Sequence, residues 1–252
     1  MNNNQPLAYR MRPKNLDEYV GQEHILGKDK ILYRTIKADR LSSIILFGPP
    51  GCGKTSLARV ISETTKYKFY KINAVTAGVA DIKKVIEETK NFMLNPIGKA
   101  ILFIDEIHRF NKLQQDALLP FVENGTVILI GATTENPYFE VNKALISRSM
   151  VIKLNALTEE NIYQILKNAI ERPDGLGEYQ IKIEEKTLRK LAGISNGDVR
   201  TALNGLEVAT LTTPMSEDGY IHLTDEVIKN SVQTRKAIFD KNGEQHYHNT
   251  NL

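Results

Sequence analysis

Apolar residues follow two patterns along the chain, and the first of them occupies residues 43–154. Five short runs there are rich in Ile, Val, Leu and Phe and almost continuously apolar: residues 43–48, 68–73, 100–105, 126–132 and 150–154. Runs of this length and continuity are typical of strands buried on both faces of a parallel sheet. Longer stretches with helical spacing, such as 54–65 and 81–94, separate the runs. The pattern predicts an α/β fold, with a five-stranded parallel sheet between helices.

After Leu154 the pattern becomes helical. The stretch TEENIYQILKNAIE begins at Thr158, whose hydroxyl is suited to cap a helix, with two glutamates in the first turn. Three more helical stretches follow, at 184–195, 196–211 and 224–232, and no strand is expected among them. We therefore expect an α/β domain at residues 1–154, a small all-helical domain at 155–232, and a polar, weakly patterned tail at 233–252.

Composition narrows the class of protein only slightly. The hydrophobic share of 41% is that of an ordinary globular chain, and the net charge of +3 permits a nucleic-acid partner without indicating one. Cys52 is the only cysteine, so no internal disulfide forms, which fits a reducing cytosol. No apolar run approaches 18 residues, and the first residues contain no apolar signal segment, so we expect a cytoplasmic protein without a membrane partner.

A phosphate-binding motif follows the first apolar run and opens a helix. Its sequence GPPGCGKT matches G-x-x-x-x-G-K-[ST] at every position: Gly48, Pro49, Pro50, Gly51, Cys52, Gly53, Lys54 and Thr55. In such a P-loop, backbone N–H groups and the helix N-terminus surround the phosphates, and we include Ser56 of the first helical turn. Lys54 is expected to reach the β- and γ-phosphates of ATP, and Thr55 to ligate Mg²⁺. Cys52 is interpreted as a small filler of the loop.

Two acidic residues, Asp105 and Glu106, end the third apolar run. Asp105 is placed to hold Mg²⁺ with Thr55, and Glu106 points elsewhere, since side chains alternate along a strand. Glu106 could then act as general base toward an attacking water, whereas a solvated strand end is the simpler alternative. The distance in sequence from Lys54 leaves room for one more strand, which suits additional-strand ATPases.

These motifs resemble the AAA+ ATPases and, within them, the family of replication-associated recombination protein A. The resemblance runs from about residue 6 to 247, and its most specific wording is IHRFNKLQQDALLPFVENG at 107–125 and ATTENPYFE at 132–140. It implies a sensor 1 role for Thr134, which would bond the γ-phosphate or the attacking water. It also implies that Arg148 is an arginine finger acting in trans on a neighbouring subunit.

The same resemblance implies further roles around the nucleotide. Arg200 matches sensor 2 and would approach the γ-phosphate from the helical domain, although both arginines could be ordinary exposed charges. The segment Tyr19, Val20, Gly21 and Gln22 matches the stretch that contacts adenine, with Val20 as the apolar wall. His24 and His108 have no partner at metal-ligand spacing and are interpreted as structural residues.

The resemblance implies a DNA-dependent ATPase of replication-fork maintenance and recombination. Single-strand-binding protein is the implied partner, with a tetramer as assembly and the nucleoid as location. Family members are longer, so we expect a C-terminally shortened chain with weaker tetramer formation and slow hydrolysis. Two alternatives remain open: a subunit of a clamp loader or Holliday-junction branch-migration motor, and a scaffold that binds ATP without hydrolysing it.

Overall fold

A computed structural model describes residues 5–232, which form two compact units. Residues 13–156 make up one unit, called here the α/β unit. Residues 5–12 and 157–232 make up the other, called here the helical unit. The predicted tail at 233–252 lies outside the described residues.

The α/β unit contains a five-stranded sheet in the order β2-β3-β4-β1-β5, in which every neighbouring pair is parallel. The strands are β1 (Ser43–Phe47), β2 (Lys68–Asn73), β3 (Ala100–Asp105), β4 (Val127–Thr133) and β5 (Ser149–Lys153). The predicted parallel sheet is thereby confirmed, with strand ends that differ by about one residue. The additional strand expected between the P-loop and Asp105 in sequence is β2, at the edge of the sheet, whereas β4 separates β1 from β3 in space.

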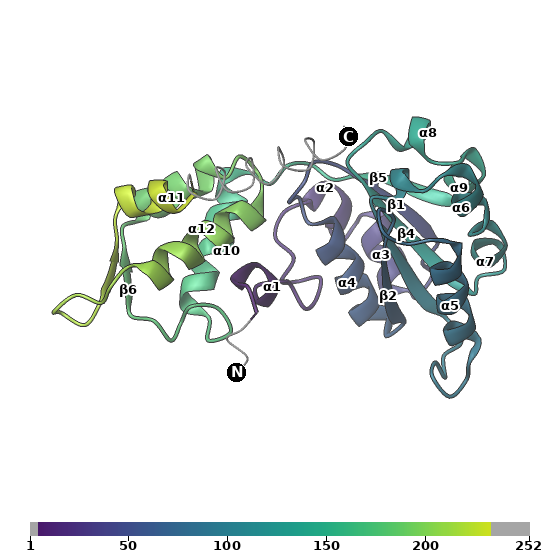
Figure 1. Cartoon of the computed structure of the whole chain (residues 1–252), viewed down its shortest axis with the longest axis horizontal. Coiled ribbons are helices and arrows are strands. Elements are labelled where there is room, and N and C mark those ends of the chain that lie inside the picture. Colours follow the sequence, from purple (N-terminus) through teal and green to yellow (C-terminus); the bar gives the residue numbers. More distant parts are fainter. Residues whose placement is uncertain (1–4, 233–252) are drawn as a thin grey trace, which may run out of the picture. The chain divides into compact units, whose positions relative to one another are not determined.

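Helices cover both faces of this sheet (Figure 1), which explains why its inner strands β1, β3 and β4 are almost continuously apolar. On one face Ile44 and Leu46 pack with α3 (Ile31–Lys37) and α4 (Lys54–Thr65). On the other, Ile45 packs with α5 (Val79–Lys90). The remaining helical segments of this unit are short: α2 (Glu23–Leu26), η1 (Ile107–Arg109), α6 (Lys112–Asp116), α7 (Leu119–Glu123), α8 (Pro137–Glu140) and α9 (Lys143–Ile146).

The helical unit contains the predicted helices and one feature that was not predicted. Its helices are α10 (Glu159–Glu171), α11 (Glu185–Ile194), α12 (Val199–Thr212) and a helical segment at 225–232. The expectation of an all-helical domain is wrong in one respect, since β6 (Ile181–Ile183) and β7 (Ile221–Leu223) form a small parallel sheet. Each strand has three residues, too few for an alternating pattern to be distinguished from a loop.

The N-terminal helix α1 (Leu7–Arg10) also differs from the expected division, because it belongs to the helical unit. Leu7 is fully buried in that unit's core, and its N–H donates to Glu207 Oε1 at 2.8 Å. Arg10 Nη1 donates to the carbonyls of Asp174 and Gly175. Position in the sequence does not indicate which of two cores a buried leucine joins, so the expected 1–154 domain wrongly included residues 5–12.

Candidate active site

Three neighbouring strands bring the predicted site residues to one edge of the α/β unit. The P-loop follows β1, Asp105 and Glu106 close β3, and Thr133 and Thr134 close β4, which lies between them. Parallel strands have their carboxyl ends at the same edge, where ligands of open α/β sheets bind. Sheet order alone therefore brings the P-loop, the acidic pair and the β4 threonines together.

The P-loop is arranged around the Lys54 side chain. Lys54 begins α4, is 9% exposed, and its Nζ donates to the carbonyls of Gly48 at 2.6 Å and Pro49 at 2.9 Å. Pro49 and Pro50 are exposed, Cys52 is buried, and Gly51, Thr55 and Ser56 are partly buried. The twelve-residue helix α4 thus starts where a loop folds back over an ammonium group, an arrangement suited to an anion.

Gly53 and Gly48 occupy positions that a larger residue could not take. Gly53 has φ +102°, and a Cβ there would lie 2.3 Å from the Tyr19 hydroxyl oxygen. A Cβ on Gly48 would lie 2.3 Å from the carbonyl oxygen of Leu154. The tight backbone curvature of a phosphate cradle is present here, so the residues fit a bound triphosphate.

Side chains from residues 19–22 support the outer side of this loop. The Tyr19 hydroxyl donates to the Gly53 carbonyl at 3.1 Å, and burial, together with the nearby Cys52, raises its pKa far above the ordinary value. Gln22 Nε2 donates to the carbonyls of Cys52 at 3.3 Å and Asn155 at 2.8 Å, while its Oε1 accepts from Asn155 N–H. The Gln22 amide is thereby occupied by protein groups. Adenine contact by Val20, Gly21 and Gln22 stays a prediction.

The two acidic residues turn to different partners. Asp105 Oδ2 lies 3.1 Å from Lys71 Nζ, which belongs to the edge strand β2. Glu106 adopts left-handed backbone dihedrals, φ 55° and ψ 45°, and its Oε2 lies 3.4 Å from His108 Nδ1. The two carboxylates therefore have different partners, and because Glu106 lies in a turn after β3, strand alternation is not the reason. Their roles stay predictions.

The β4 threonines also differ from each other. Thr134, the predicted sensor, is exposed, whereas Thr133 is fully buried. Thr133 Oγ1 lies 2.8 Å from His108 Nδ1 and accepts from the Glu135 N–H at 3.0 Å. Sequence reasoning did not identify His108 or Thr133 as parts of this site, and it assigned Tyr19 only to the stretch that contacts adenine. For His108, its position two residues after Glu106 is the one feature of the sequence that could have indicated a place in the site.

The two predicted arginines are engaged in contacts of their own. Arg148 follows α9 and is exposed, with Nη2 at 2.7 Å from Glu123 Oε1 and Nη1 donating to the Ala144 carbonyl. None of its described hydrogen bonds joins it to the P-loop or the acidic pair. In the helical unit, Arg200 opens α12 with its side chain 62% exposed and its N–H bonded to the Asp198 cap.

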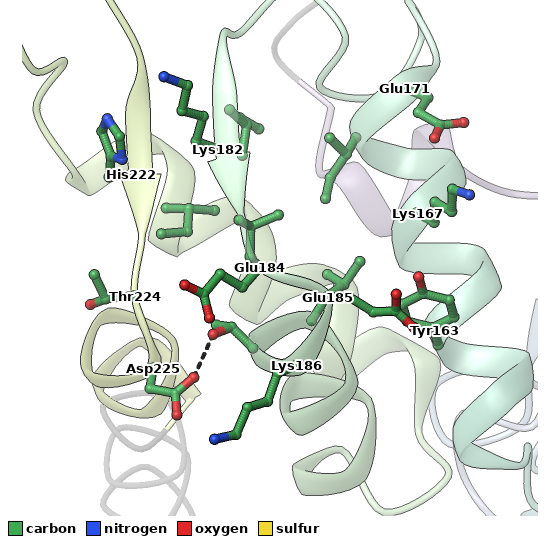
Figure 2. Close-up of a pocket in the computed structure, with 16 residues that line it drawn as sticks. Tyr163, Lys167, Glu171, Lys182, Glu184, Glu185, Lys186, His222, Thr224 and Asp225 are labelled. Atoms are coloured by element: carbon green, nitrogen blue, oxygen red, sulfur yellow. Dashed lines mark hydrogen bonds between the residues drawn. The ribbon is translucent and has the colours of Figure 1, made fainter. Parts of the chain in front are cut away.

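A separate pocket of about 760 Å³ lies within the helical unit. Figure 2 shows it, with Tyr163 and Lys167 from α10 on one side and Thr224 and Asp225 on the other. The Asp225 carboxylate accepts from the Thr187 hydroxyl at 2.5 Å and lies 2.6 Å from Lys190 Nζ. Lysines and carboxylates both line the pocket, so it shows no single charge preference, and it contains none of the predicted site residues.

Residues 5–232 contain neither a candidate metal cluster nor a membrane-spanning helix. No group of three or more His, Cys, Asp or Glu side chains there could hold a metal ion, and no helix is long and apolar enough to cross a bilayer. His24 Nε2 lies 3.0 Å from the Lys153 carbonyl, in keeping with its structural interpretation. Any Mg²⁺ at the P-loop would thus need oxygens from the nucleotide as well as from Thr55 and Asp105.

Comparison with known proteins agrees with this arrangement. The model of the ATPase family associated with various cellular activities (AAA) matches residues 44–155, and the AAA C-terminal domain model matches residues 177–250. Replication-associated recombination protein A of Bacillus subtilis is 45% identical over 243 residues, which are 96% of this chain and 56% of that protein. The Escherichia coli protein of the same name is 46% identical over 244 residues, which are 96% of this chain and 54% of that protein.

A solved structure gives the same fold. The Thermotoga maritima RuvB Holliday junction branch migration motor aligns with a TM-score of 0.67 and 25% identity, over 89% of this chain and 73% of that one. Residues 44–155 therefore form a domain of the AAA family of ATPases. Over 96% of its length the chain is similar to the relatives named replication-associated recombination protein A, although it spans only about half their length.

Proposed function

We propose that the chain binds ATP with Mg²⁺ at the P-loop and hydrolyses it. The observation that supports this most strongly is the strand order: β4 lies between β1 and β3, so the P-loop, Thr134 and the acidic pair follow or end three neighbouring strands. ATP binding requires only the P-loop. Hydrolysis also requires a carboxylate that does not bind the metal, and Glu106, whose partner is His108 and not Lys71, is available for that role.

Each residue has a distinct task in this proposal. Lys54 leaves the carbonyls of Gly48 and Pro49 and pairs with the β- and γ-phosphates. Thr55 and Asp105 would hold Mg²⁺, which, when bound, neutralises charge on the phosphate oxygens. Glu106 accepts the proton of the attacking water, and Thr134 donates a hydrogen bond to the γ-phosphate or to that water.

The two arginines give the proposal an inter-subunit component. Arg148 of one subunit offsets transition-state charge on the ATP of its neighbour, and Arg200 reaches the γ-phosphate from the helical unit. Arg148 must exchange its bond with Glu123 for one with phosphate, which is inexpensive because exposed ion pairs contribute only about 0–1 kcal/mol. A homo-oligomer follows from this component. Without that assembly, the chain would bind ATP and hydrolyse it slowly.

Turnover is proposed to drive action on DNA in replication-associated recombination, the process in the names of the two bacterial relatives. Single-strand-binding protein is the proposed partner, in the nucleoid of the cytoplasm. The likeness to a branch migration motor supports a second candidate, in which a Holliday junction is the substrate.

Hydrolysis measured with different DNA structures tests the proposal. ATP turnover is followed without DNA, with blunt duplex, with a gapped fork, and with a four-way junction. Stimulation by the fork beyond that by the blunt duplex is expected, while selective stimulation by the junction would favour the second candidate. Turnover that is indifferent to all these DNAs would contradict the coupling. ATP binding without turnover would leave only the scaffold function.

A further inference from the structure

We infer that His108 is a positioning residue for Glu106, and that its Nδ1 links the Glu106 carboxylate to the end of β4 through Thr133. The inference rests on the proposed role of Glu106 as general base and adds a residue that sets where that base lies. Its basis is a chain of three side chains from three parts of the fold: the turn after β3, η1, and the last residue of β4.

A single nitrogen lies between two oxygens in this chain. His108 Nδ1 is 2.8 Å from Thr133 Oγ1 and 3.4 Å from Glu106 Oε2. The His108 side chain is only 9% exposed and Thr133 is fully buried, so water does not readily replace the contact between these two side chains. The Glu106 side chain is 35% exposed and has room to move toward or away from the imidazole.

The proton on Nδ1 decides whether the contact with Glu106 is favourable. In a neutral imidazole, one ring nitrogen donates and the other accepts. A bare Nδ1 would direct its lone pair at the Glu106 carboxylate, whereas an Nδ1–H can donate to Glu106 or to Thr133. Thr133 Oγ1 already accepts the Glu135 N–H and retains a lone pair for a second donor. The Thr133 hydroxyl could also donate to a bare Nδ1, but the Glu106 carboxylate could not, so only the Nδ1–H tautomer makes both contacts favourable.

Because one proton cannot serve two acceptors fully, the two contacts compete. In the described state the shorter contact is with Thr133, so Glu106 is held only weakly. Thr133 directly precedes Thr134, the residue proposed to meet the γ-phosphate. Movement of this segment toward ATP would weaken the bond between Thr133 and His108 and transfer the Nδ1–H to Glu106. The base would thus be oriented when a triphosphate is bound.

Three variants of the whole chain separate positioning from packing. In His108→Leu the side chain keeps its bulk and loses the donor, and in His108→Asn an amide nitrogen can take the place of Nδ1. We expect His108→Leu to lower kcat by about tenfold, the usual weight of a hydrogen bond to a charged group, with the Kd for ATP unchanged. We expect His108→Asn to recover most of that loss. Thr133→Val added to His108→Leu should cause little further decrease, since both act through one proton.

A kcat for His108→Leu equal to that of the parent, or equal losses in the Leu and Asn variants, would overturn the inference. So would a large further decrease in kcat when Thr133→Val is added to His108→Leu. If the parent hydrolyses ATP, Glu106→Gln does not, and His108→Leu matches the parent, then the proposed function stands and only the inference fails.

A spectroscopic readout decides the inference even where no hydrolysis occurs. Imidazole ¹⁵N NMR of the ¹⁵N-histidine-labelled chain reports which ring nitrogen of His108 carries the proton, with His108→Asn used to assign the signals. We expect the Nδ1–H tautomer, and a change in the Nδ1 signal when ATPγS is added but not when ADP is added. An Nε2–H tautomer, or identical signals with both nucleotides, would contradict it. Failure of hydrolysis alone would count only against the proposed function.

Discussion

Lys71 Nζ on β2 lies 3.1 Å from Asp105 Oδ2 at the end of β3, so the carboxylate proposed to hold Mg²⁺ already has a cationic neighbour. The two residues are held in place by the register between β2 and β3, in which Asn73 pairs with Asp105. A lysine at this distance repels a divalent cation, although both side chains are partly exposed and solvent screens the effect.

Lys71→Gln should therefore tighten Mg²⁺ binding, by about threefold, as the energies of partly exposed ion pairs suggest. The measurement is a Mg²⁺ titration of ATP binding, followed with a fluorescent ATP analogue. Lys68→Gln is the matched control, since Lys68 is also on β2 but donates to the Leu94 carbonyl. An unchanged or weaker Mg²⁺ affinity in Lys71→Gln would count against Asp105 as a metal ligand.

Gly53→Ala should abolish ATP binding. The new Cβ would lie 2.3 Å from the Tyr19 hydroxyl oxygen, and the φ of +102° is unfavourable for any residue with a Cβ. Gly125→Ala is the control, because Gly125 also has a positive φ, +70°, but its Cβ would meet nothing within 4 Å. Titration with ATP should show no binding to Gly53→Ala and parent-like affinity for Gly125→Ala. Equal ATP affinities of the two variants would show that binding does not require the close approach of Tyr19 to Gly53.

Much of this site follows from the sequence because its signals are local. The P-loop is a contiguous motif, and the strands around it are continuously apolar because helices cover both faces of the sheet. The position of β4 between β1 and β3 does not follow from the order of the runs. That position is what brings Thr133 beside His108.

Other parts of the molecule depend on contacts between residues far apart in sequence. The Gln22 side chain bridges Cys52 and Asn155, and Leu7 and Met11 join a core whose remaining buried residues begin at Leu157. Neither contact leaves a periodic pattern. The segment between β6 and β7 contains the helices α11 and α12, so the two strands pair over a long distance in sequence. Each strand has only three residues, which is too few to predict a sheet.

Asp218, in the helical unit, has a lowered pKa, from which we predict how the stability of the protein depends on pH. Lys182 Nζ at 3.0 Å and His222 Nε2 at 2.9 Å lower the pKa of Asp218 from 3.8 to about 2. A pKa lowered by folding stabilises the protein above the unfolded value, near 3.8, and that stabilisation is lost as pH falls toward 2.

Asp218→Asn should accordingly reduce the fall in the urea midpoint of the helical unit between about pH 5 and pH 2.5. The measurement is urea unfolding followed by circular dichroism in the parent and the variant at each pH. Asp225 and Glu160, whose pKa values are also lowered by their basic neighbours, are present in both proteins, so the difference isolates Asp218. Parallel curves would show that the ion pairs with Asp218 do not contribute.

The proposed action of Arg148 in trans is tested by mixing two inactive variants. Arg148→Ala should lower hydrolysis by roughly a hundredfold or more, since an arginine finger is typically worth 10³–10⁵ in kcat. Glu106→Gln should be equally inactive. In a mixture, some sites pair an intact Glu106 with an intact Arg148 from the neighbour, so ATPase activity should partly return. No recovery over a range of protein concentrations would contradict action between subunits.

ATP binding and hydrolysis measured together in the parent and in Glu106→Gln test the central proposal most directly. Binding is measured by equilibrium titration with Mg²⁺–ATP, and hydrolysis by phosphate release in the presence of forked DNA. The account predicts that both proteins bind ATP with similar affinity and that only the parent releases phosphate. Equal rates of phosphate release from the two proteins would contradict it, because Glu106 would then not be the base.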